Sequence, residues 1–328
     1  MKEIPIFFTF DKYYVMPAAV AFHSLLKSAD KTYMYRLHVL HTGLRVSDQK
    51  LLMQVVSRFK NATLSFLDTS DFPIAGKAQK GKAHFSKEIF YKLIAAKVFP
   101  QYDRIICSDV DVIFQGDIAP SYFMYENEFF YYAGVGQIVQ SRRMESYKEE
   151  FTLNEQEVLE QEIAAGYLLM NLKAIRENGM QKRLTDFYLN NYHRLKLPEQ
   201  DCLILCCWPH VRQLPMEYVV CNSYYRMDTA SIAFNAKNAS LPKERKSMLN
   251  LFEQALSHPI QLHYVGPYKP WNSFRCPRQR YWFAMLKEAG CVLRYVASIP
   301  MYAQQRSKRY SFRRFIRKMS QKVCKLIN

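Results

Sequence analysis

The sequence has little glycine. Only 10 of its 328 residues are Gly, and neither a G-x-G-x-x-G run nor a Walker-type glycine loop occurs. Such runs let a backbone loop approach a pyrophosphate closely or cradle nucleotide phosphates. The chain is therefore not expected to be a Rossmann dinucleotide-binding protein or a P-loop NTPase.

Long apolar runs and paired cysteines are missing as well. No stretch reaches the roughly 18 uninterrupted apolar residues of a membrane-spanning helix. The opening MKEIPIFFTFDKYYV differs from a signal peptide, because its apolar run is short and β-rich and no small-residue cleavage site follows. The expected compartment is the cytoplasm, where the eight Cys stay reduced. Their spacing matches no zinc site, so we expect them to pack in the core.

Acidic residues are scarce at the C-terminal end. From Lys269 to Asn328 there are 15 basic residues and one acidic residue, Glu288, whereas residues 1–268 carry 31 basic and 28 acidic residues. The net charge of +17 thus belongs mainly to the last part of the chain. Because a protein that wraps nucleic acid usually spreads basic charge over its domain, no nucleic-acid partner is expected.

The basic tail has the pattern of an amphipathic helix. From Lys308 onward its apolar residues recur at helical spacing, and Arg and Lys fill most other positions. Such a helix suits an anionic membrane surface, where each basic residue contributes about 1 kcal/mol. Two alternatives stay open: a helix packed on the body with a solvated charged face, and a non-enzymatic basic protein that binds anionic lipid or nucleic acid.

The first 115 residues alternate strand and helix patterns. Strands are expected at Ile4–Phe10, Arg36–His41, Ala62–Leu67 and Arg104–Cys107, and helices at Pro17–Leu26, Ser47–Arg58 and Ser86 to Pro100. Ser47 and Ser86 are the expected caps of the last two helices. Further strands are expected at Phe129–Gly136, Gly166–Leu172 and Ile260–Tyr264, with helices from Leu172 to Tyr192 and from Pro198. This rhythm predicts a parallel sheet with helices on both faces, which binds ligands at the carboxyl ends of its strands.

Two carboxylates follow the fourth strand. Asp109-Val110-Asp111 comes directly after the apolar RIIC. If the strand continues, its alternation directs both side chains to one face, where they would form a hard-oxygen site for Mg²⁺ or Mn²⁺. A lone D-x-D is a weak signal, but its position after a buried strand strengthens it; surface Asp residues ending a strand are the alternative.

Two enzyme classes use D-x-D at a strand end. In haloacid-dehalogenase-like phosphatases the first Asp, here Asp109, is the nucleophile. That motif normally begins the catalytic domain, whereas over a hundred α/β residues precede it here. In metal-dependent glycosyltransferases the pair holds a divalent ion against a nucleotide diphosphate, after a nucleotide-binding half, which fits this layout.

Several later segments carry a family resemblance. His263–Asn272, H-Y-V-G-P-Y-K-P-W-N, closely resembles the H-Y-x-G-x-x-K-P-W signature of glycosyltransferase family 8. FFTFDKYY resembles the uridine-binding opening of that family, SKEIFYKL its S/T-x-x-x-Y-x-R-L helix, AAGYLLMNL its F-N-A/S-G-x-x-L-x-N-L strand, and Glu199-Gln200-Asp201 its D-Q-D. The resemblance covers residues 1–275, so we expect a catalytic domain at 1–275 and a basic helical membrane-association region at 276–328.

The resemblance implies a fold, a metal and a donor. The fold would be of the GT-A type, a Rossmann-like mixed sheet flanked by helices, followed by the basic helical tail. Asp109, Asp111 and His263 would bind Mn²⁺, with Mg²⁺ as the alternative. The residues implied to bind the nucleotide sugar are Thr9, Asp11, Tyr14, Lys92, Asp109, Val110, Ala165, Gly166, Gly266 and Lys269.

Three departures from the family pattern surround the sugar. Lys92 stands where the family has Arg, Ala164 where it has Asn, and Glu199 where it has Asp. Lys keeps the charge of Arg but loses its planar fork. The metal residues are unaffected, so UDP and the ion are implied more firmly than the hexose, for which galactose or glucose is expected.

The family retains anomeric configuration, which implies catalytic roles for residues of the segment Glu199-Gln200-Asp201. Gln200 is the group expected behind the anomeric carbon, and Glu199 and Asp201 are the alternatives. An amide is a poor nucleophile, so same-face attack is preferred to a covalent intermediate. The implied enzyme moves a hexose from a UDP-sugar to a lipopolysaccharide or other surface glycan, peripheral on the inner face of the cell membrane.

Overall fold

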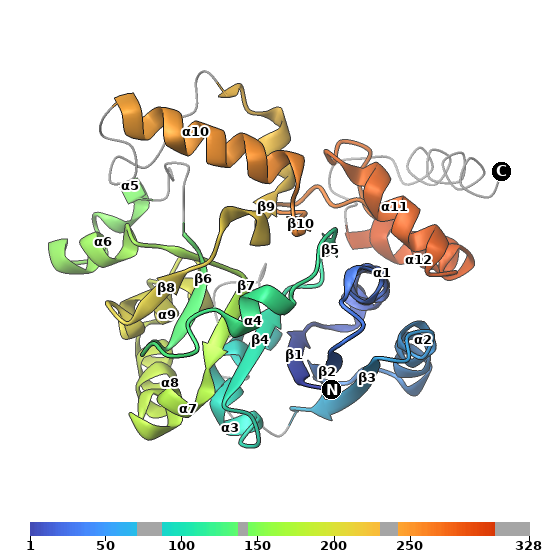
Figure 1. Cartoon of the computed structure of the whole chain (residues 1–328), viewed down its shortest axis with the longest axis horizontal. Helices are drawn as coiled ribbons and strands as arrows, with labels where there is room; N and C mark the ends of the chain where they lie inside the picture. The colour runs from blue at the N-terminus through green and yellow to red at the C-terminus, as the bar shows by residue number, and fades with distance from the viewer. Residues whose placement is uncertain (71–86, 137–143, 230–241, 306–328) are drawn as a thin grey trace.

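The computed structural model describes residues 1–70, 87–136, 144–229 and 242–305. Its large sheet has seven strands in the order β3-β2-β1-β4-β7-β6-β8 (Figure 1). These strands are β1 (Glu3–Thr9), β2 (Met34–His41), β3 (Ala62–Asp68), β4 (Arg104–Ser108), β6 (Tyr132–Gly136), β7 (Ile163–Asn171) and β8 (Val211–Gln213).

Helices connect these strands. The first half contains η1 (Lys12–Tyr14), α1 (Val15–Ser28), α2 (Val46–Val56), η2 (Lys87–Ile94), α3 (Ala95–Val98) and α4 (Ala119–Phe123), where η marks a 3₁₀ helix. The middle contains α5 (Met144–Tyr147), α6 (Leu153–Leu159), α7 (Leu172–Glu177), α8 (Met180–Asn191) and α9 (Pro198–Cys207). The last part contains η3 (Met216–Tyr218), η4 (Asn222–Arg226), α10 (Pro242–Ser257), α11 (Gln279–Glu288) and α12 (Val292–Gln305).

The sheet is mixed. β3, β2, β1 and β4 run parallel, as the alternating rhythm predicted, whereas β7 runs antiparallel to both β4 and β6. The parallel half ends at β4, so β1 and β4 finish at the same edge: Phe8 pairs with Ser108, and Asp109 follows directly. That edge is where the D-x-D segment emerges.

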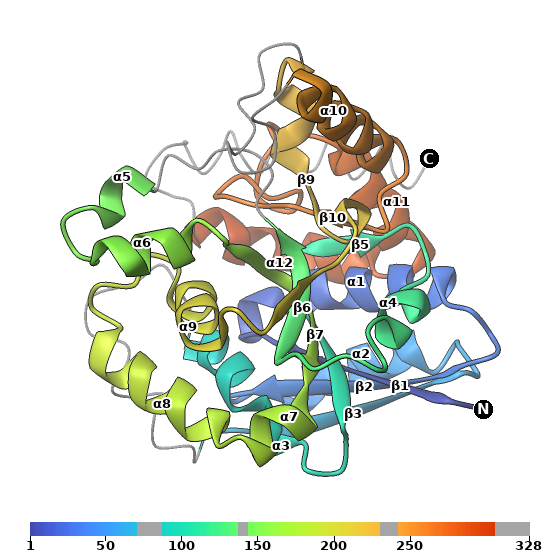
Figure 2. The ribbon, with the colours of Figure 1, turned by 60° about the vertical axis from the view of Figure 1, so that its left-hand side comes forward.

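Strand alternation divides the interior between the two faces of the sheet. In β1, Ile6 and Phe8 belong to one buried cluster and Phe7 to the other. α1 and α2 cover the first face, and η2, α3, α8 and α9 lie on the second (Figure 2). This arrangement explains why the central strands read as nearly continuous apolar runs.

A second sheet has three strands in the order β5-β10-β9, with β5 (Val112–Phe114), β9 (Val220–Cys221) and β10 (Gln261–His263). β10 pairs antiparallel with β5, and His263 lies opposite Val112. Chain segments that are about 150 residues apart in sequence therefore meet directly after the D-x-D segment.

The core continues beyond residue 275. Trp282 of α11 and Tyr295 and Tyr302 of α12 are fully buried in the cluster that contains α1. Figure 1 shows α11 and α12 beside α1. The division at residue 275 stays a prediction, and the amphipathic pattern from Lys308 lies outside the described residues. Among those that are described, no helix has the length and apolar character to span a membrane.

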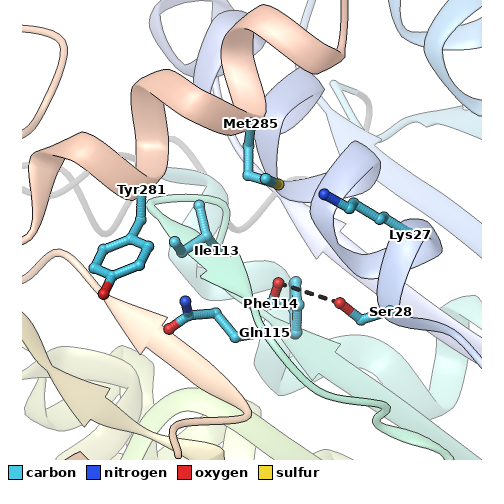
Figure 3. Close-up of a pocket in the computed structure, with 7 residues that line it drawn as sticks. All are labelled: Lys27, Ser28, Ile113, Phe114, Gln115, Tyr281 and Met285. Carbon is cyan, nitrogen blue, oxygen red and sulfur yellow. Dashed lines mark hydrogen bonds between the residues drawn. The ribbon is translucent and has the colours of Figure 1, made fainter. Parts of the chain in front are cut away.

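Where α11 meets α1 and β5 there is a hollow of about 210 Å³ (Figure 3). Lys27 and Ser28 contribute from α1, Phe114 and Gln115 from the end of β5, and Met285 from α11. The residues that line it include none of the expected site residues.

Several local expectations were wrong. Ser47 does not cap a helix: α2 begins at Val46 after Arg45, without a side-chain cap. The segment after residue 86 is mainly 3₁₀ helix rather than α-helix, with Phe90 to Ala96 all buried, so packing sets its shape. The proposed cap Ser86 itself lies outside the described residues. The helix expected from Leu172 to Tyr192 is broken at Gly179, whose φ of +63° favours glycine.

Candidate active site

The D-x-D segment lies between two strands, not within one. β4 ends at Ser108 and β5 begins at Val112, so the expectation of strand alternation at Asp109-Val110-Asp111 was wrong. The segment is fixed at both ends instead: Asp109 N–H donates to Gly166 O at 3.0 Å, and Tyr264 N–H donates to Asp111 O at 2.9 Å. These bonds to β7 and to the residue after β10 bring both carboxylates to the same side.

His263 closes the cluster. Its Nε2 lies 3.2 Å from Asp111 Oδ1 and 3.6 Å from Asp109 Oδ2. One potential ligand atom from each of the three residues falls within 4.8 Å of the others. Buried Gln261, on the same strand, donates to Ser108 Oγ at 2.9 Å and so holds β10 against the end of β4.

Two lysines accompany the carboxylates. Lys269 Nζ lies 2.5 Å from Asp111 Oδ2, and Lys92 Nζ lies 2.6 Å from Asp109 Oδ1. Burial by itself would raise the pKa of Asp111, but the charges of Lys269 and His263 hold it well below its usual range. Asp111 is therefore ionised at neutral pH, as a metal ligand must be.

Lys92 also links the cluster to α9. It is 2% exposed, its Nζ donates to Ala165 O at 2.9 Å, and it lies 3.6 Å from Glu199 Oε1. Burial opposes its charge, but Asp109 and Glu199 raise the pKa of Lys92. Burial raises the pKa of Glu199, against the opposing effect of Lys92. Among the described residues, buried Glu199 Oε2 has no hydrogen-bond partner.

Gly166 allows the cluster to be compact. A Cβ at this position would lie 2.6 Å from both Nδ1 and Cε1 of His263. Real side-chain carbons do not approach so closely, so β7 lies against the imidazole only because residue 166 lacks a side chain. Gly266 has a different reason for its identity: its φ is +74°, the left-handed region that favours glycine.

The structure separates the members of the Glu199-Gln200-Asp201 trio. Gln200 Oε1 accepts from Ala165 N–H at 3.0 Å, which joins α9 to the strand beside the cluster. Asp201 is buried and accepts from Tyr147 O–H at 2.8 Å and from the backbone N–H groups of Lys196 and Leu197. These bonds give Asp201 a structural role at the start of α9.

The N-terminal residues reach the site from β1. Thr9 ends that strand, and Asp11 accepts from Tyr13 N–H at 2.8 Å, capping η1. Tyr14 lies edge-on to Trp271, with ring centroids 5.8 Å apart. Burial, followed by the charge of Asp111, raises the pKa of Tyr14.

The loop after β10 is held by side-chain amides. Val265 N–H donates to Asn222 Oδ1 at 3.0 Å, and Lys269 N–H donates to Asn272 Oδ1 at 2.9 Å. Asn222 is 3% exposed. Val110 is also buried.

Two residues near the site were missed from the sequence. Trp271 was noticed only as part of a signature, yet it packs against Tyr14. Glu162 was not among the expected site residues, yet it is 5% exposed and accepts from Gln200 Nε2. An acidic residue directly before an apolar strand was the available signal for Glu162.

The cluster suits a divalent ion. Two carboxylates and one imidazole form a mixed oxygen and nitrogen donor set, which fits Mn²⁺ and is less typical of Mg²⁺. Lys92 and Lys269 balance the carboxylate charge.

Fold and site together define a glycosyltransferase of the GT-A type. The glycosyl transferase family 8 model matches residues 5–275, and the chain belongs to that family. This membership favours the glycosyltransferase over the phosphatase and the non-enzymatic alternatives. A lipopolysaccharide 1,2-glucosyltransferase of Escherichia coli is 23% identical over 268 residues, which cover 80% of this chain and 72% of that protein.

Solved structures share the fold. The apo WbbM bifunctional glycosyltransferase matches with a TM-score of 0.70 at 18% identity, over 90% of this chain. The chain spans about half of WbbM, 51% of its length. The galactosyltransferase LgtC, in complex with donor and acceptor sugar analogues, matches with a TM-score of 0.65 at 18% identity, over 88% of this chain and 95% of LgtC. These likenesses support the mixed GT-A sheet.

Proposed function

We propose that the protein is a retaining, Mn²⁺-dependent glycosyltransferase that moves a hexose, galactose or glucose, from a UDP-sugar to a lipopolysaccharide or related surface glycan. The observation that carries this proposal is the Asp109, Asp111 and His263 cluster, with Lys92 and Lys269 beside it, in a chain of family 8. The Escherichia coli relative, a lipopolysaccharide glucosyltransferase, supports the acceptor class.

The donor is assigned along the edge of the sheet where β1 and β4 end. Tyr14 would stack on the uracil, with Thr9 and Asp11 near its edge. The backbone of Val110 would meet the ribose, while Gly266 allows close approach to the diphosphate and Lys269 offers it a cation. The ion, when bound, would neutralise charge on the diphosphate oxygens.

The sugar would lie between β7 and α9. Ala165, Gly166 and Lys92 line this side, and the unpartnered Glu199 Oε2 suits a sugar hydroxyl as its hydrogen-bond donor. In the preferred step the bond from the anomeric carbon to the phosphate oxygen breaks, and its electron pair leaves with UDP. The acceptor hydroxyl oxygen bonds the same face, and its proton passes to the departing phosphate. Gln200 Oε1 would stabilise the positive charge that develops on the sugar.

A screen of UDP-sugars with and without Mn²⁺ tests the proposal. We expect hydrolysis or transfer of one UDP-hexose that EDTA abolishes and Mn²⁺ restores, with Mg²⁺ less effective. NMR of the product should show the anomeric configuration of the donor. Inversion, or equal turnover in EDTA, would contradict the proposal.

The matched controls use two aspartates near opposite ends of the same strand. Asp111→Asn removes a proposed ligand and should abolish metal-dependent turnover. Asp103→Asn alters a carboxylate that is 75% exposed at the start of β4 and should leave turnover unchanged.

A further inference from the structure

A buried carboxylate lies behind Gln200. Glu162 follows α6 and directly precedes β7, and it is 5% exposed. A buried carboxylate is unfavourable unless it is well hydrogen-bonded, so its presence in the interior calls for a reason. One of its partners is the side chain of Gln200, whose Nε2 donates to Glu162 Oε1.

The two contacts of the Gln200 amide fix its orientation. Ala165 N–H can only donate, so the atom 3.0 Å from it must be the carbonyl oxygen Oε1. With Oε1 facing Ala165 N–H, the atom that faces Glu162 is the Nε2 amino group, which donates to Glu162 Oε1. A flipped amide would lose both bonds. The orientation thus follows from chemistry rather than from a choice between similar atoms.

The fixed orientation has a consequence for catalysis. A carbonyl oxygen has two lone pairs, and Ala165 N–H uses one of the pair on Oε1. Donation from Nε2 to a carboxylate polarises the amide and increases the negative charge on Oε1. That oxygen lies against the strand whose next residue, Gly166, abuts His263.

We infer that Glu162 is a positioning residue for the glycosyl transfer: it holds the Gln200 amide with its carbonyl oxygen available to the anomeric centre and strengthens the charge on that oxygen. This inference rests on the proposed function of the same site. It also identifies a polar side chain two residues before Ala164, where the family pattern has lost its Asn.

Steady-state kinetics distinguish a positioning role of Glu162 in catalysis from a role in the stability of the fold alone. Glu162→Gln keeps an acceptor but removes the charge, and Glu162→Leu removes both. We expect kcat to fall about tenfold in the first variant and about 100-fold in the second, because misplacement of a catalytic group by about 1 Å has effects of that size. The KM for the UDP-sugar, the Kd for UDP and the Tm should stay close to wild type. Glu157→Gln, an exposed residue of α6, is the matched control and should behave as wild type.

A double-mutant cycle identifies the partner. If Glu162 acts through Gln200, Glu162→Leu should add no further loss of kcat to Gln200→Ala. Additive losses, unchanged kcat in both Glu162 variants, or a fall in UDP affinity and Tm that parallels the loss of kcat would each overturn the inference.

The hydrogen bond between Glu162 and Gln200, called the clamp below, can also be followed by a measurement that does not depend on turnover. In protein labelled with ¹⁵N-glutamine, the side-chain signal of Gln200 is the one lost in Gln200→Ala. It should shift in Glu162→Leu and stay in place in Glu157→Gln. A signal unmoved in Glu162→Leu would overturn the clamp, whereas a wild-type protein that turns over no UDP-sugar would overturn the proposed function.

Discussion

Individual side chains in this site have their roles set by their partners. From the sequence, Gln200 was the preferred catalytic group, with its neighbours Glu199 and Asp201 as alternatives. In the structure Asp201 accepts hydrogen bonds from Tyr147 and from two backbone N–H groups, and Glu199 forms an ion pair with Lys92. The side chain of Gln200 is hydrogen-bonded to Ala165 and to Glu162. Only these contacts distinguish Asp201, which stabilises the start of α9, from Gln200, the candidate catalytic group.

Replacing Gln200 is the direct test at this scale. Gln200→Ala removes the carbonyl oxygen proposed to face the anomeric centre, so kcat should fall about 100-fold or more. The Kd for UDP, measured by calorimetry with Mn²⁺ present, should change little, because the described hydrogen bonds of the Gln200 side chain go to Ala165 and Glu162, on the side proposed for the sugar. Retained turnover would refute the role. Gln156→Ala, on α6, serves as a control, because the side chain of Gln156 bonds a local backbone oxygen.

At the scale of elements, the site exists because three strands meet there. Asp109 follows the end of β4, His263 ends β10, and β7 brings Gly166 against the imidazole. The D-x-D residues need no strand geometry of their own, since backbone bonds to β7 and to Tyr264 hold them. The close contact of β7 with His263 makes the spacing of these elements sensitive to one added carbon.

Gly166→Ala should therefore weaken metal binding. Its Cβ would displace His263, and the apparent Kd for Mn²⁺, followed by calorimetry, should rise about tenfold or more. Gly134→Ala is the steric control, because a Cβ there would lie 2.6 Å from Ile163 Cγ2 but touch none of the three candidate ligands. Both variants should lose stability; equal Mn²⁺ affinity in the two would contradict the prediction.

β2 carries a pH-sensitive element away from the site. His38 Nδ1 lies 2.6 Å from Ser65 Oγ and Nε2 lies 3.0 Å from Tyr102 O–H, and burial lowers the pKa of His38 to about 4. The folded state thus favours the neutral ring. This stability is present above the unfolded pKa of about 6.5 and is lost as the pH falls toward 4.

Urea unfolding at two pH values checks this expectation. Between pH 7 and pH 5 His38 should account for at most about 2 kcal/mol of lost unfolding free energy. In His38→Gln, which keeps polar contacts but does not titrate, the loss between the two pH values should be smaller by that amount. Equal pH sensitivity in variant and wild type would contradict the assignment.

For the whole molecule, the position of the C-terminal region matters most. The net positive charge past residue 268 suggested an appended tail, yet Trp282, Tyr295 and Tyr302 are fully buried in the cluster around α1. Trp271 bridges this region to the site, because its ring meets Tyr14 on one side and Tyr302, at 6.5 Å, on another. A truncation that cuts into α12 would therefore disturb the site.

The membrane prediction is best tested by removing residues 306–328 alone. The shortened protein should lose binding to vesicles that contain anionic lipid, measured by co-sedimentation, because nine basic residues after Met301 go with it. Its Kd for UDP with Mn²⁺ should stay within about twofold of the full chain, since α12 is kept. Vesicles of neutral lipid are the control and should bind neither protein. Undiminished binding to anionic vesicles would contradict the prediction.

The sequence by itself determined the features that depend on local patterns and on signature motifs. Alternating apolar strands and helices predicted the parallel half of the sheet, and the motifs around Asp109, His263 and Lys269 indicated the family, because both depend on residue type and spacing alone. The antiparallel course of β7, the 3₁₀ form of η2 and the clamp between Glu162 and Gln200 were decided only by the tertiary structure. Each depends on which distant side chains become neighbours, and burial beside such a neighbour determines whether a carboxylate braces a helix, meets a lysine or orients an amide.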